Sequence, residues 1–242
     1  MFDLKEEIKK LENIDPKNPP SSQKMARIMA TVLDQALSKK AFEIFQDQRF
    51  RQLADFDKIS QVERDRIFNE LVLAGITVLM LLLETPDLGI PEELKDYFLL
   101  IKDEIPKAHL DQLASYGIEK EHLKNWKELI QMRYEEYRED KHECRKAAME
   151  LESREGNLNI KTLEEIQLLL PVQTVAVGCH THICRSKTKG KDELFKVTLR
   201  WLGRFYVDIR ILIEGRKVDP LTKAKVNARR FFGDIKHRIQ QD

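Results

Sequence analysis

The chain is poor in cysteine and in aromatic residues. It has three cysteines among 242 residues, and aromatic residues make up 7% of it while charged residues make up 34%. An odd and small number of cysteines is atypical of a secreted domain held by disulfides, and a chain of this length can bury a sufficient core without them. High charge with few aromatics favours helices over a β-sandwich. We therefore expect an intracellular, cytoplasmic protein that is rich in helix.

The sequence also lacks an obvious targeting or membrane-spanning segment. Its first 15 residues, MFDLKEEIKKLENID, mix acids with bases and contain no apolar core of a signal peptide. The longest apolar run, residues 71–83, has 13 residues. Because about 20 apolar residues are needed to cross a bilayer, this run predicts a helix buried in the protein core and no transmembrane segment.

Common catalytic motifs are missing as well. There is no Gly-rich phosphate loop, no G-x-S-x-G and no H-E-x-x-H. Two Glu-x-x-His pairs, typical of di-iron bundles, end at His122 and His142. The two Glu-x-x-His pairs fall on one predicted helix and point about 200° apart, so they cannot bind the same two iron ions. The sequence assigns no catalytic residue and favours a non-enzymatic protein, while leaving the question of an enzyme open.

Helix start and stop signals recur along the chain. Ser60 followed by Glu63 is typical of a helix N-terminus, and Asp192 after a glycine is another N-cap candidate. Pro106 is expected to start a helix and Pro171 to end one. The pattern predicts a mainly α fold, a multi-helix globular domain of about seven helices.

Residues 172–214 fit two interpretations. Apolar residues alternate with polar ones in parts of this segment, as in a small antiparallel β-meander. The same segment also places apolar side chains on one helical arc: Phe195, Leu199, Leu202, Tyr206, Ile209 and Ile213. We favour the helix, with an α+β fold containing a meander near residues 172–214 as the alternative.

The net charge of +1 conceals a charge asymmetry. From Arg185 onward there are 16 Lys and Arg against 7 Asp and Glu, a charge of +9, so the rest of the chain carries −8. We divide the chain into an N-terminal arm (1–20), an acidic helical body (21–170) and a basic module (171–242) packed on the body as one domain. Such an asymmetry favours an anionic partner, either nucleic acid or an acidic protein. The candidate anion-binding residues are Arg185, Lys187, Lys189, Lys191, Lys196, Arg200, Arg204, Arg229 and Arg230.

A short segment rich in cysteine and histidine, GCHTHIC (residues 178–184), suggests an alternative function. Thiolate and imidazole groups are ligands for zinc and iron, and the candidates are Cys179, His180, His182 and Cys184. The segment alone provides two or three ligands, so a further one would come from His142 or Cys144. The alternative is therefore a metal-binding helical protein with zinc or iron. Buried apolar cysteines and histidines that cap helix ends would produce the same pattern.

Overall fold

The computed structural model describes residues 21–86 and 88–214, and within these ranges every regular element is a helix. Seven α-helices and two short 3₁₀-helices follow one another along the chain. They are α2 (Ser22–Gln46), α3 (Gln48–Leu53), η1 (Phe56–Lys58), α4 (Gln61–Leu83), η2 (Glu92–Leu94), α5 (Lys95–Ser115), α6 (Lys120–Arg154), α7 (Ile160–Ile183) and α8 (Asp192–Glu214). The predicted mainly α fold is confirmed. The meander alternative is wrong, because residues 172–183 and 192–214 are helical.

Helix α4 forms the centre of the molecule. It begins at the predicted N-cap, where the Ser60 hydroxyl accepts a hydrogen bond from the backbone N–H of Glu63. Residues 71–83 are all buried, and α2, α5, α6, α7 and α8 all contact this helix. The prediction of a core helix in this region is confirmed, and one hydrophobic core extends from α2 to α8.

The same helix is the one described segment that could cross a membrane by length and composition alone. It has 23 residues, rather than the 13 of the uninterrupted apolar run, because less apolar residues precede that run within the helix. However, 83% of its most apolar window is buried by the rest of the protein. That burial is what the core helix of a folded domain shows; the absence of a transmembrane segment stays a prediction.

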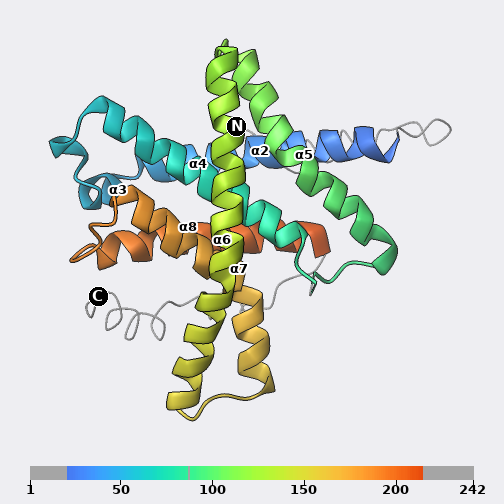
Figure 1. Ribbon diagram of the computed structural model, residues 1–242, viewed down its shortest axis with the longest axis vertical. Helices are drawn as coiled ribbons and strands as arrows, with labels where there is room; N and C mark the ends of the chain where they lie inside the picture. The colour runs from blue at the N-terminus through green and yellow to red at the C-terminus, as the bar shows by residue number, and fades with distance from the viewer. Residues whose placement is uncertain (1–20, 87, 215–242) are drawn as a thin grey trace.

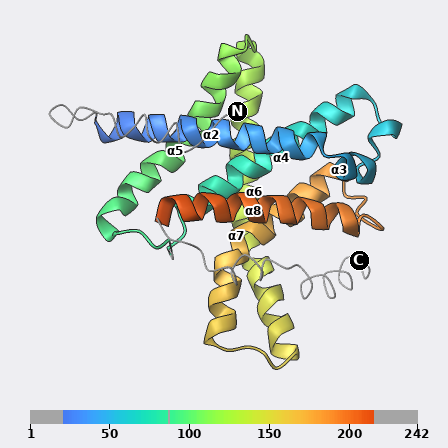
Figure 2. The ribbon, with the colours of Figure 1, turned by 180° about the vertical axis from the view of Figure 1, so that it is seen from behind.

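The helices cross rather than lie in a parallel bundle. Helix α6 runs along the longest axis of the molecule, and it forms one hairpin with α5 at one end and another with α7 at the other (Figure 1). Helices α2 and α8 cross this axis on the opposite side, as Figure 2 shows. Helix α8 contacts α4 and α7 on one side of the core and also α2 and α3, and its Arg200 and Arg204 are exposed.

Two prolines lie inside helices, contrary to the sequence prediction. Pro106 is within α5, and Pro171 is within α7 and is buried. Proline removes one backbone hydrogen bond and usually breaks a helix, but tertiary packing can offset this cost of about 3 kcal/mol. Helix α7 therefore continues across the proposed boundary between residues 170 and 171, with Leu170 and Val172 both in the core.

Helix α8 matches the helical interpretation of its sequence. Of the predicted apolar arc, the residues from Phe195 to Ile209 are buried, and Ile213 is partly buried against the core. The opposite side carries Arg200, Arg204 and Asp208, which are exposed. The chain thus presents a charged stripe along the outer face of α8.

Candidate functional site

The Cys/His segment forms the last turns of α7. Arg66 of α4 holds the end of this helix, because its guanidinium donates hydrogen bonds to the carbonyl oxygens of His182 (2.8 Å) and Ile183 (2.9 Å). The last carbonyls of a helix have no partner within the helix, and a cation near them is favourable. The segment is therefore part of a helix end that another helix caps.

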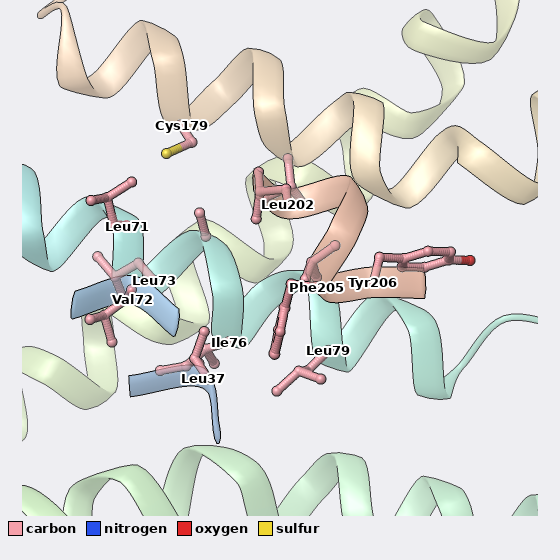
Figure 3. Packing of buried hydrophobic residues seen from close by; sticks show 14 of the residues in the cluster. Leu37, Leu71, Val72, Leu73, Ile76, Leu79, Cys179, Leu202, Phe205 and Tyr206 are labelled. Carbon is pink, nitrogen blue, oxygen red and sulfur yellow. The ribbon is translucent and has the colours of Figure 1, made fainter. Parts of the chain in front are cut away.

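Cys179 is directed into the protein core. Its side chain is fully buried, and Sγ donates to the backbone oxygen of Glu70 at 3.8 Å. Figure 3 shows it among apolar side chains such as Leu71 and Leu202. Burial raises the pKa of the Cys179 thiol well above its usual range. A thiol that stays protonated is a poor metal ligand and a poor nucleophile.

The two histidines of the segment bind different partners. Nε2 of His180 donates to the carbonyl oxygen of Lys191 at 3.2 Å, and burial lowers the pKa of this imidazole. Nε2 of His182 lies 2.7 Å from Oε1 of Glu136 on α6. Residues two apart on a helix point about 200° apart, so the two imidazoles diverge instead of converging on one point.

The two remaining thiols lie apart, Cys144 on α6 and Cys184 just after α7. Cys184 is half-buried just after the end of α7, near Lys191 and Arg66. Cys144 of α6 lies beside Thr174 of α7, which precedes Cys184 by ten residues, a rise of about 15 Å along a helix. His142 is exposed on α6. Neither candidate for the additional ligand is placed beside Cys184.

These positions leave the predicted metal site unassembled. Within residues 21–86 and 88–214, no three His, Cys, Asp or Glu side chains are grouped so that they could hold a metal ion. The physical reason is the helical conformation, which distributes the four candidates over the core, the start of α8 and the face of α6. No feature of these residues favours the zinc or iron alternative.

The histidine end of α7 instead belongs to a buried ionic network. Arg133 of α6 donates two hydrogen bonds to the carboxylate of Glu70 on α4, at 2.9 and 3.1 Å. It also pairs with Glu136 at 3.1 Å, and Glu136 in turn contacts His182. The Glu70 and Arg133 side chains are 10% and 11% exposed, so neither charge is well solvated. This network joins α4, α6 and α7 and is a structural feature of the core.

Several of the predicted anion-binding residues are already paired with carboxylates. Arg185 binds Glu63 through two hydrogen bonds of 2.9 and 2.6 Å. Lys191 pairs with Asp55 and donates to the carbonyl oxygen of Leu53 at 3.2 Å.

Lys196, the first basic residue of α8, is also neutralised locally, because its Nζ lies 2.6 Å from the carboxylate of Glu193. Arg185 and Lys191 therefore join the loop before α8 to α4 and to the segment around Asp55, while the Lys196 pair lies within α8 itself. A bound anion would have to compete with these internal carboxylates.

Four other predicted anion-binding residues have no carboxylate partner in the described part of the chain. Lys187 and Lys189 in the loop before α8, and Arg200 and Arg204 on its outer face, are exposed. None of the four has an ion pair within the described part of the chain. Arg229 and Arg230, the last two candidates, lie outside the described residues. Arg200 and Arg204 are four residues apart, so they lie on one side of α8, one turn from each other.

Arg200 and Arg204 line a cleft between α8 and the end of α2 with the start of α3. Its volume is about 310 Å³. The other lining residues are Lys40, Glu43, Ile44, Asp47, Arg49, Val197, Trp201, Phe205 and Asp208. The side chain of Trp201 is held in place because its indole N–H donates to the carbonyl oxygen of Lys40 at 3.0 Å.

Sequence reasoning missed the half of the cleft that α2 and α3 contribute. Lys40 and Arg49 precede Arg200 by about 150 residues, and no motif connects them. Both sit in ordinary helical sequence whose charged residues are typical of a solvated face. Only the crossing of α2 and α8 brings these side chains together. No protein family, curated protein or solved structure matches this chain.

Proposed function

We propose that this protein is a non-enzymatic intracellular binding protein, whose basic surface on α8 and the preceding loop binds an anionic macromolecule. The observation that carries the proposal is that Arg200 and Arg204 are exposed and have no carboxylate partner in the described residues. Most neighbouring basic side chains are paired with carboxylates of the protein, so these two guanidiniums are available to an external anion. Guanidinium groups bind carboxylates and phosphates through two parallel hydrogen bonds.

The loop before α8 extends the same surface. Lys187 and Lys189 are exposed, and α8 begins at Asp192, about 12 Å of helical rise before Arg200. This rise exceeds the Debye length at physiological ionic strength, about 8 Å, so the lysine pair and the arginine pair act as separate contacts. A polyanion that spans both pairs contacts all four cations, which attract it and accelerate its association at low salt.

The proposal is tested by binding of labelled polyanions to the full chain. The probes are a 20-nucleotide DNA of about 20 charges, as single strand and duplex, and polyglutamate of similar length. We expect binding that weakens by tenfold or more between about 50 and about 200 mM salt. Charge reversal at Lys187, Lys189, Arg200 and Arg204 together should abolish it.

The matched control reverses exposed lysines on a different element. Lys120→Glu with Lys127→Glu changes two exposed residues of α6 that have no ion pair among the described residues. This variant should retain most of the affinity if the surface on α8 is the site. Equal losses in both variants, or the absence of salt-dependent binding to every polyanion, would reject the proposed function.

A further inference from the structure

The side chains around Arg200 and Arg204 restrict the kind of anion that fits between α2 and α8. The cleft contains three carboxylates, those of Glu43, Asp47 and Asp208. Its two other cations are already paired, Lys40 with Glu43 at 2.9 Å and Arg49 with Glu193 at 2.8 Å. Two unpaired guanidiniums thus share the cleft with the carboxylates of Asp47 and Asp208, which have no cationic partner in the described part of the chain.

This alternation of charge is unfavourable for a nucleic acid backbone. Duplex DNA carries about one negative charge per 1.7 Å of its axis, so a strand along α8 would place phosphates against carboxylates as well as arginines. Along the exposed stripe of α8, Asp208 follows Arg204 by one turn and has no cationic partner in the described part of the chain. A partner with separate carboxylates of its own avoids this repulsion, because it meets only the two arginines.

Apolar side chains form the rest of the cleft. Ile44, Val197, Trp201 and Phe205 contribute to its lining. The Trp201 ring is held at its N–H by α2 and needs no reorganisation to receive a partner. Tryptophan and arginine are the residues most enriched at the energetic centres of protein–protein interfaces. A volume of about 310 Å³ accommodates a large apolar side chain from a partner.

We propose that this cleft binds an acidic segment of a partner protein, which inserts one apolar side chain next to Trp201 and directs two carboxylates to Arg200 and Arg204. The inference rests on the proposed function and specifies its partner as protein rather than nucleic acid. Because Arg200 and Arg204 are one helical turn apart, the two carboxylates would be spaced by about one turn of helix, or by two residues of extended chain.

The experiment selects peptides without assuming their sequence. The full-length protein is used to select from a displayed library of random peptides of about 12 residues, long enough to span the cleft at about 3.3 Å per residue. We expect the selected peptides to combine at least two acidic residues with an aliphatic or aromatic residue. Their affinity, measured by fluorescence anisotropy, should fall by tenfold or more in Arg200→Glu/Arg204→Glu.

Two further variants make the result specific to the cleft. Arg200→Gln/Arg204→Gln removes the charges without reversing them and should weaken peptide binding in the same direction. Lys120→Glu/Lys127→Glu, the control on α6, reverses two exposed cations outside the cleft lining and should leave most of the peptide affinity intact. Circular dichroism and thermal unfolding confirm that each variant is folded before its affinity is compared.

The possible failures separate this inference from the proposed function. If DNA binds more tightly than the selected peptides and loses affinity in Arg200→Glu/Arg204→Glu, the basic surface is functional but its partner is nucleic acid, and the inference is wrong. Selection of neutral or basic peptides, or acidic peptides that bind both arginine variants normally, also overturns it. If neither peptides nor polyanions bind, both proposals fail.

Discussion

Gly178 of α7 lies directly against the ring of Tyr137 on α6, so that a β-carbon at residue 178 would be 2.1 Å from Cε1 of Tyr137. The Tyr137 side chain is fully buried. The first residue of the Cys/His segment is thus the contact point at which α6 and α7 cross. Its neighbour Cys179 packs on α4, so this part of α7 is buried on two sides.

Gly178→Ala should destabilise the protein although alanine is the better helix former. The added methyl group would collide with a buried ring that has little room to move, and overpacking of this kind costs about 1–3 kcal/mol. Urea unfolding followed by circular dichroism measures the change. In a Tyr137→Leu background the same substitution should cost much less, because the ring is gone. An equal cost in both backgrounds would contradict the contact.

Removing one member of the buried network on α4 and α6 should be more costly. Arg133→Met leaves the carboxylate of Glu70 buried without its partner, and breaking such a pair costs about 3–5 kcal/mol. The double variant Glu70→Gln/Arg133→Met should recover part of the loss, since no unpaired charge then remains at Glu70. The control Lys124→Met removes an exposed pair with Glu128 and should change the unfolding free energy little. Similar effects of Arg133→Met and Lys124→Met would contradict the burial of the network.

The stability of the protein should decline in acid partly through Glu63. Its hydrogen bonds with Arg185, and then with Arg66, lower the pKa of this carboxyl from 4.5 to about 2. The folded state therefore binds its proton less readily than the unfolded state, and the stabilisation is complete above about pH 4.5 and is lost as the pH falls towards about 2. The unfolding free energies of the natural chain and of Glu63→Gln should converge across this range. A constant difference between them would refute this assignment.

Arg185→Gln provides a second variant for the same measurement. Loss of the first partner should raise the pKa of Glu63 towards its ordinary value, because Arg66 alone remains. The loss of stability due to Glu63 then still begins near pH 4.5, but it is smaller and is complete at a higher pH than in the natural chain. If the two profiles coincide, Arg185 does not control this carboxyl.

Cys179 should be inert towards thiol reagents in the folded protein. In the variant Cys144→Ser/Cys184→Ser it is the only thiol, and it is fully buried with a raised pKa. Reaction with Ellman's reagent should be as slow as unfolding and should become complete in urea. The half-buried Cys184, alone in Cys144→Ser/Cys179→Ala, should react faster. Rapid reaction of Cys179 would contradict its place in the core, and protection lost on addition of a chelator would revive the metal alternative.

Local patterns predicted much of the helical fold and little of the candidate site. The N-cap at Ser60 and the apolar arc of α8 are properties of neighbouring residues, so periodicity and capping chemistry were sufficient to find them. Pro106 and Pro171 show where local rules failed. Their intrinsic cost is outweighed by the packing of residues on either side, which no local rule includes.

Periodicity, capping signals and charge counts were enough to predict helices, a core at residues 71–83 and a basic region after Arg185. Tertiary structure alone decided which of those cations are neutralised, because Glu63 and Asp55 are more than 120 residues from Arg185 and Lys191 along the chain. It also separated the Cys/His candidates by the rotation of α7 and brought α2 beside Arg200. Ion pairing and cleft formation depend on distances in space, which the crossing of helices sets and the order of residues does not reveal.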